Sequence, residues 1–208
     1  MIRQASPDDV PQLATLVKMS GKASLTGVLD ISPSLCASQF LLFAVAQDNG
    51  HFSYRQHIVI SPEPSDPQRA IQGCAAYWPR LNNAQMREAT IRTFIHFYGE
   101  LHVKSVLLKA QYLDKVICLP EPENLPVGHI AIEESARRSG KGTALLNALK
   151  AKAIELNRRG LELDVECHNL PAITLYERFG FAITGQHFPC EGGKKIGLMP
   201  HFHMKLSL

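Results

Sequence analysis

The sequence has no long hydrophobic run, few cysteines and almost no excess of either charge. Its most apolar stretch, FLLFAVA at 40–46, is far shorter than the roughly 20 residues that a membrane-spanning helix needs. The five cysteines are an odd number, lie far apart and include no C-x-x-C pair. This spacing argues against a disulfide framework and against a zinc knuckle. The chain is therefore expected to be neither a membrane-spanning protein nor a small disulfide-rich domain.

Charge also limits the partners that the chain could bind. The 22 Lys and Arg residues oppose 19 Asp and Glu residues, and a net charge of +3 is too weak to indicate a nucleic-acid surface. The N-terminal segment MIRQASPDDV lacks the basic and then apolar pattern of a signal peptide. We predict a folded cytoplasmic protein that has neither nucleic acid nor a membrane as a partner.

Hydrophobic periodicity predicts an α/β protein with a mixed sheet. Strands are expected at 2–5, 57–61, 70–78, 128–132, 161–167, 181–188 and 201–206, and helices at 7–20, 34–47, 140–159 and 171–179. Prolines and polar residues at 62–67 predict a turn that joins an antiparallel hairpin. The strand–helix–strand unit over 128–167 predicts a right-handed crossover between two parallel strands.

The segment Arg137–Thr143, RRSGKGT, lies between a predicted strand and the start of a predicted helix. Free backbone N–H groups and the helix dipole favour an anion at such a position, and glycines allow close approach. Neither G-x-x-x-x-G-K-[ST] nor G-x-G-x-x-G fits this segment, which disfavours a nucleotide-binding protein. A phosphate cradle and a solvated, glycine-softened helix start are both consistent with the spacing.

A second pattern follows the strand at 161–167. Asn169 is placed to cap the helix that Pro171 begins. Tyr176 lies two turns into that helix, where it is either a half-buried core residue or a general acid that reaches a cleft.

Together these segments resemble the GNAT superfamily of acyl-CoA-dependent N-acyltransferases. Its [QR]-x-x-G-x-[GA] loop matches Arg137, Gly140 and Gly142, preceded by the apolar triplet at 130–132. Its N-x-x-A-x-x-x-Y-x-x-x-G-F pattern is complete from Asn169 to Phe181. The resemblance implies a twisted mixed sheet of about six to seven strands, with helices on both faces and a splay between the two central parallel strands.

The resemblance also implies direct acetyl transfer from acetyl-CoA to a primary amine of a small molecule or peptide, with Tyr176 protonating the leaving thiolate. A backbone N–H near Ile132 would stabilise the oxyanion. The implied coenzyme-binding residues are Ile130, Ala131, Ile132, Arg137, Arg138, Ser139, Gly140, Lys141, Gly142, Thr143, Asn169 and Tyr176. A non-catalytic acyl-CoA-binding sensor or regulatory module remains the alternative.

The amine arrives largely protonated, so a base or a water chain is needed. Some members of the superfamily place a catalytic carboxylate at the position of Asp164, which we take as the expected base. Other groups expected near the cleft are Glu133, Glu166, His129 and His168, and each could equally be a solvated group at a strand end.

Three further histidines raise the question of a metal. His201 and His203 share one face of a strand, and His187 lies on the neighbouring strand. No third ligand is apparent in the sequence, so we predict no metal cofactor. The basic pair at 194–195 is expected in a solvated hairpin loop.

The length between the third and fourth strands departs from the superfamily. We predict one acyltransferase domain over 1–208 with a helical insertion at about 80–126, formed by one bent helix or two short ones. Apolar residues in this insertion predict that it packs, either over the acceptor side of the cleft or in a homodimer contact.

Overall fold

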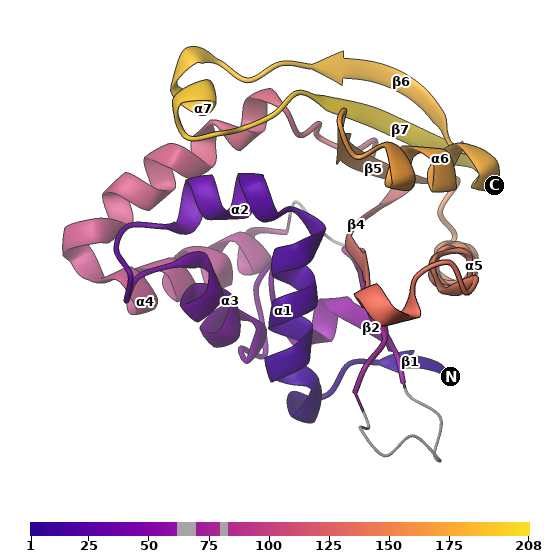
Figure 1. Cartoon of the computed structure of the whole chain (residues 1–208), viewed down its shortest axis with the longest axis horizontal. Helices are drawn as coiled ribbons and strands as arrows, with labels where there is room; N and C mark the ends of the chain where they lie inside the picture. The colour runs from indigo at the N-terminus through magenta and orange to yellow at the C-terminus, as the bar shows by residue number, and fades with distance from the viewer. Residues whose placement is uncertain (62–69, 80–82) are drawn as a thin grey trace.

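A seven-stranded mixed sheet organises the chain in the computed structural model, which describes residues 1–61, 70–79 and 83–208 (Figure 1). The strand order is β1-β2-β3-β4-β5-β7-β6. The strands are β1 (Ile2–Gln4), β2 (His57–Ile60), β3 (Gly73–Tyr77), β4 (Asn124–Ile132), β5 (Gly160–Glu166), β6 (Ala182–His187) and β7 (His201–Ser207). The turn expected at 62–67 lies outside the described residues, whereas the antiparallel hairpin of β2 and β3 is confirmed.

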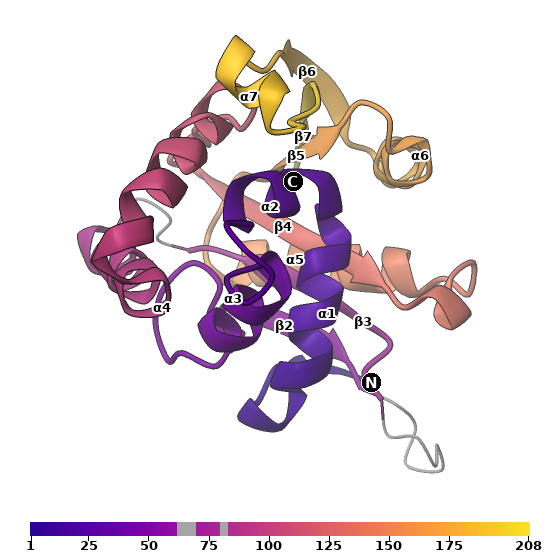
Figure 2. The same ribbon diagram turned by 60° about the vertical axis from the view of Figure 1, so that its left-hand side comes forward.

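Seven α-helices flank this sheet in the described ranges. They are α1 (Val10–Ser20), α2 (Lys22–Leu29), α3 (Ala37–Val45), α4 (Ala84–Gln111), α5 (Lys141–Glu155), α6 (Leu170–Phe179) and α7 (Glu191–Lys195). In Figure 2, α1 and α3 lie in front of the sheet and α5 lies behind it. The predicted α/β class, with helices on both faces, is therefore confirmed. Across the described part of the chain, none of the helices has both the length and the apolar character needed to cross a membrane.

The two central strands, β4 and β5, are parallel but paired only at one end. Asn124–Pro126 lies beside Gly160–Glu162, and the pairing stops there. Beyond Pro126 the strands separate, which confirms the expected splay. β4 begins at Asn124 and not at Gly128, and Pro126 occupies the last position that is paired with β5. Proline donates no backbone hydrogen bond and is tolerated where strand pairing ends.

A β-bulge in β4 changes which face its side chains occupy. Ala76 of β3 pairs with Gly128, but Cys74 pairs with Ala131, so β4 has one extra residue between these pairs. His129 lies in this bulge and has a left-handed backbone conformation, with a φ of 48°. As a result, Leu125 and Val127 face the α5 side of the sheet, whereas Ala131 belongs to the core under α1.

Successive side chains of β2 point to opposite faces of the sheet and contribute to the apolar core on each face. Val59 faces α1 and α3, whereas Ile58 and Ile60 face α5. Helix α5 contributes Leu145 and Leu149, which have no exposed surface. The two apolar layers fix the sheet between the helices, so the separation of β4 and β5 occurs in a rigid frame.

The segment between β3 and β4 forms α4, which bends at Gly99. This glycine has φ 66° and ψ 172°, which breaks the helix in the way that the sequence allowed. The Phe40 ring of α3 stacks on Phe94 at 4.7 Å and on Tyr98 at 5.4 Å between ring centroids. Helix α4 therefore completes the core on the α1 side.

Two short helices were not predicted. Gly21 was expected to end the first helical region, but α2 follows it directly. Gly27 in α2 lies so close to the Ile196 carbonyl oxygen that a Cβ would collide with it, so this helix depends on a distant contact. The prediction of a loop at Lys194 and Lys195 is wrong, because these residues belong to the short helix α7. Their side chains are exposed.

Candidate active site

A cavity of about 240 Å³ opens where β4 and β5 separate. The end of α1, the start of α2, the segment after α4, α6 and β7 complete its walls. Tyr176, Asp164, Asn169 and Ile130, four of the residues singled out in the sequence, line this single cavity. Residues from distant parts of the chain are therefore brought together as a site.

Tyr176 enters the cavity from α6. Asn169 caps this helix by accepting a hydrogen bond from the Ala172 N–H, as predicted, and Pro171 lies in its first turn. The Tyr176 side chain is buried, and burial raises the pKa of its hydroxyl. The hydroxyl has no hydrogen-bond partner among the residues that the structure describes. It is thus a protonated, uncommitted donor at the cavity wall.

Asp164 projects from β5 and is not the solvated strand-end group that its position allowed. Its side chain is 11% exposed. One carboxylate oxygen accepts from the Cys118 backbone N–H at 3.2 Å, and the other lies 3.0 Å from His203 Nδ1. This hydrogen bond is the main reason why the pKa of His203 is raised. Asp164, the expected base, therefore forms a carboxylate–imidazole pair with His203.

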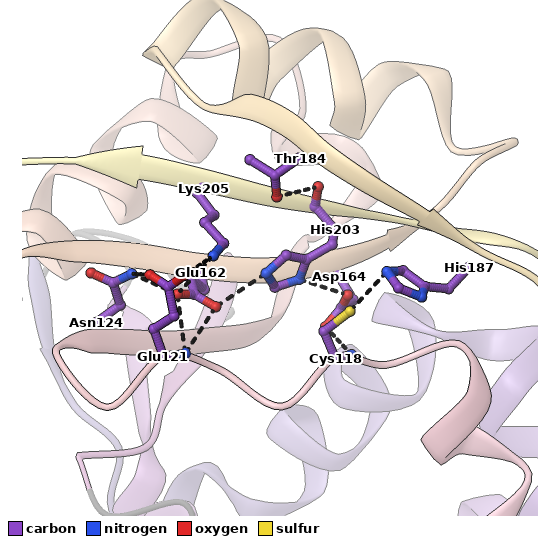
Figure 3. A network of polar contacts seen from close by, with 9 residues as sticks. All are labelled: Cys118, Glu121, Asn124, Glu162, Asp164, Thr184, His187, His203 and Lys205. Atoms are coloured by element: carbon purple, nitrogen blue, oxygen red, sulfur yellow. Dashed lines mark hydrogen bonds and ion pairs between the residues drawn. The ribbon is translucent and has the colours of Figure 1, made fainter.

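Glu162, also on β5, is a buried carboxylate that was not among the residues singled out in the sequence. Its side chain is 2% exposed, and Oε2 lies 3.1 Å from His203 Nε2 (Figure 3). The Glu121 N–H and the Asn124 amide also donate to it, and the Lys205 ammonium lies 3.7 Å away. His203 is consequently held between two carboxylates.

Cys118 extends this network toward β6. Its thiol lies 3.0 Å from His187 Nε2, and Figure 3 shows the two side chains pointing toward one another. Burial, together with the charges of Asp164 and Glu162, raises the pKa of the thiol to about 11. The thiol is therefore protonated and donates to His187. His201 lies apart from this pair, with Nδ1 2.8 Å from the Met199 carbonyl oxygen.

Three histidines gather on the β2–β4 side, where His51 and His129 line the cavity and His57 lies buried behind them. His57 Nδ1 lies 2.9 Å from the Ser53 carbonyl oxygen, so this nitrogen carries the proton. His57 Nε2 is then an acceptor, and it receives a hydrogen bond from His129 Nδ1 at 3.0 Å. His51 stacks on Trp78 at 4.3 Å, beside His129. Burial lowers the pKa of His51 and of His57 to about 4, so these rings are neutral near pH 7.

The loop Arg137–Thr143 lies outside this cavity, at the N-terminus of α5. Gly140 has a left-handed φ of 79° with open space around it, and Arg138 has a φ of 58°. The first N–H groups of α5 have no intrahelical carbonyl to bind, because every helix start leaves them free. In the described ranges neither Arg138 nor Lys141 forms an ion pair. The loop therefore presents free donors and cations together.

Helix packing also explains why position 142 is a glycine. A Cβ there would lie 2.8 Å from a Leu175 methyl group of α6, so the small residue lets α5 and α6 approach. The loop is held by Arg137 Nε, which donates to the Ile132 carbonyl oxygen at 3.3 Å, and by Ser139, whose hydroxyl donates to the Ala136 carbonyl oxygen.

The other expected groups divide into two sets. Glu166 lines the cavity and accepts a hydrogen bond from the Ser24 hydroxyl at 3.0 Å. Glu133 instead caps the turn at Glu134–Ala136, and His168 is exposed at the end of β5. Neither of these two lines the cavity. Cys118, Glu162 and His57 were missed because their contacts join segments that are far apart in the sequence.

The mixed sheet, which splays between β4 and β5, agrees with the acyltransferase fold that the sequence motifs implied. A profile of the Acetyltransferase (GNAT) family matches residues 70–181, more than half of the chain. The chain belongs to this family.

Individual proteins are similar to this chain, two in fold and one in part of its sequence. The N-acetyltransferase of Staphylococcus aureus Mu50 superposes with a TM-score of 0.65 at 18% identity, over 99% of this chain and 100% of that one. A GCN5-related N-acetyltransferase from Kribbella flavida gives 0.57 at 15% identity, over 100% and 97% of the two chains. An N-alpha-acetyltransferase of Sulfolobus acidocaldarius is 42% identical over 64 residues, which span 29% of this chain and 38% of that relative.

Proposed function

We propose that the protein transfers an acetyl group from acetyl-CoA to a primary amine of a small molecule or peptide. The observation that carries this proposal is the Tyr176 hydroxyl, buried and protonated in the same cavity as Asp164, where β4 and β5 have parted. Family membership supports the reaction class, and the name of the Sulfolobus relative supports an amine as the acceptor.

The coenzyme would be held by two elements. Phosphates suit the N-terminus of α5, where Arg138, Lys141 and the free N–H groups lie. The edge of β4 at 130–132 faces the gap to β5 and has no strand partner there among the described residues, so its backbone groups can pair with an amide-bearing arm. With the phosphates at α5 and the amide-bearing arm along β4, the cavity itself remains for the thioester and the acceptor.

The transfer requires two proton movements. As the amine nitrogen forms its bond to the thioester carbonyl carbon, Asp164, steadied by His203, accepts the amine proton. A backbone N–H near Ile132 stabilises the oxyanion. When the carbon–sulfur bond breaks, Tyr176 donates its proton to the leaving sulfur, which a hydroxyl with a raised pKa can do at neutral pH.

The segment between α4 and β4 supports an acceptor role for the insertion. Leu113, Ile117 and Pro120 line the cavity. Removing the whole insertion is an unsuitable test, because Phe94 and Tyr98 of α4 are buried in the core against Phe40. Single substitutions at the cavity wall probe the same role without removing that core.

The test is release of free CoA thiol from acetyl-CoA over a panel of small amines and peptides with a free α-amine, with the acetylated product identified by mass. We expect turnover with at least one acceptor and a large loss of it in Asp164→Asn. Binding of acetyl-CoA without turnover on any amine would instead favour the acyl-CoA sensor and overturn the proposal.

A further inference from the structure

Three side chains with metal-binding atoms converge on one wall of the cavity from three separate segments. They are Cys118 before β4, Asp164 on β5 and His203 on β7. The thiol, one carboxylate oxygen and one imidazole nitrogen of Cys118, Asp164 and His203 all lie within 4.8 Å of one another. His187, at the end of β6, lies behind this group and outside the cavity lining, and its Nε2 is 3.0 Å from the same sulfur (Figure 3).

The surroundings of His203 favour a cation at this cluster. Its Nε2 lies 3.1 Å from Glu162, a carboxylate that is itself held by the Glu121 N–H and the Asn124 amide. Metal-binding histidines commonly donate their second ring N–H to a carboxylate in this way. When Nε2–H is donated to Glu162, the neutral ring turns the lone pair of Nδ1 toward Asp164 at 3.0 Å. Two acceptor atoms at that distance need a cation between them, either a proton or a metal ion.

The donor set identifies the ion. Calcium and magnesium prefer oxygen ligands alone, whereas one thiolate, one carboxylate and two imidazoles suit a borderline-soft ion in tetrahedral geometry. We propose that Cys118, Asp164, His187 and His203 bind one Zn²⁺ ion, with Glu162 orienting His203. No third ligand for the histidines is apparent from the sequence, because Cys118 and Asp164 approach them only in the folded chain.

Zinc binding releases the Cys118 thiol proton, since the thiolate is the ligand, and replaces the proton shared by His203 and Asp164. The metal therefore occupies the atoms that the transfer reaction needs for its own proton. The zinc-bound protein is the inactive form and the metal-free protein is the active one. This consequence rests on the proposed function, whereas the metal site does not.

Cobalt(II) is a direct probe, because it occupies zinc sites and gives a thiolate-to-metal charge-transfer absorption. The full-length protein, first stripped with a chelator, is titrated with Co²⁺ and then with Zn²⁺. We expect one equivalent of Co²⁺ to produce the thiolate band, and one equivalent of Zn²⁺ to abolish it. Absence of the band, or its saturation only with many equivalents, would overturn the proposal.

Two variants and a matched control locate the site. Cys118→Ser should remove the thiolate band, while Cys36→Ser, a cysteine at the start of α3, should retain it. His187→Gln leaves the sulfur in place and should weaken Co²⁺ binding at least tenfold. Thermal unfolding of the metal-free variants checks that each is folded. An unchanged band in Cys118→Ser, or unchanged affinity in His187→Gln, contradicts the assigned ligands.

A separate arm tests the effect on activity. Stoichiometric Zn²⁺ should inhibit acetyl transfer by the wild-type protein by more than tenfold, and a chelator should restore it. If Co²⁺ binds as expected but no amine is acetylated, the metal site stands and the proposed function fails. Full activity with one bound Zn²⁺ would overturn the inhibitory role.

Discussion

Mild acid should destabilise the protein through the buried histidines beside β4. His57 has no exposed surface, and its two ring nitrogens are already committed to Ser53 and His129. Burial lowers the pKa of His57 and of His51 to about 4, with the charge of His57 adding to the effect on His51. The pKa of His129 is also lowered well below its ordinary value. Each ring is thus held neutral in the folded state.

The sign and size of the effect follow from proton linkage. Above about pH 6.5 these histidines are neutral in both states, so they contribute no pH dependence. As the pH falls from 6.5 toward 4, the unfolded chain binds protons that the folded chain does not, and stability is lost. Between pH 7 and pH 5 each such histidine costs about 2 kcal/mol, so His51 and His57 together cost about 4 kcal/mol.

Urea unfolding at pH 7, 6 and 5 measures this loss, with the change between pH values as the readout. His57→Gln should reduce the loss by about 2 kcal/mol, because glutamine does not titrate. His168→Gln, which removes an exposed histidine, should leave the loss unchanged. Because its pKa is raised, His203 stabilises the folded state as the pH falls, and this contribution is the same in all three proteins. The difference in stability loss between wild type and His57→Gln therefore measures the contribution of His57. Equal pH dependence in wild type and His57→Gln would refute the reasoning.

Three further predictions concern the loop Arg137–Thr143, proposed to bind the coenzyme, and the segment between α4 and β4, proposed to contact the acceptor. Gly140→Ala should lower the free energy of unfolding by about 1–2 kcal/mol, because φ is 79°, and an unchanged value would contradict the left-handed cap. Lys141→Ala should weaken acetyl-CoA binding in calorimetry, more at low salt than at high salt, and a salt-independent loss would argue against phosphate contact. Ile117→Ala should raise the KM for the acceptor about tenfold. The KM for acetyl-CoA should stay constant, and a change confined to acetyl-CoA would contradict an acceptor-side position.

Local patterns in the sequence predicted the parts of the fold that depend on local physics. The cap at Asn169, the bend at Gly99 and the hairpin of β2 and β3 follow from residue types at fixed spacing. Helix α2 was missed because its amphipathic pattern is weak and Gly27 is explained only by contact with Ile196. The start of β4 was misplaced because Pro126 has a strand role only at the point where two strands part.

The candidate site was predicted in outline but not in its network. Tyr176 and Asp164 were found from their positions in a motif and a strand, and both line the cavity. Glu162 was not singled out, because its burial depends on the loop before β4 and on His203 of β7. Such partners cannot be read from spacing, since six strands and α-helices, β4, α5, β5, α6, β6 and α7, lie between Cys118 and His203 in the chain. Tertiary pairing decides which polar residues become a network.

The central claim is that Tyr176 protonates the leaving thiolate in an acetyl transfer reaction. The most direct measurement is the rate of CoA thiol release by Tyr176→Phe, with the best acceptor from the panel and acetyl-CoA affinity measured in parallel. The account predicts that kcat falls by about 10²–10⁴ while the affinity is kept, and that Tyr54→Phe, outside the cavity, retains the wild-type rate. A wild-type kcat in Tyr176→Phe would contradict the account.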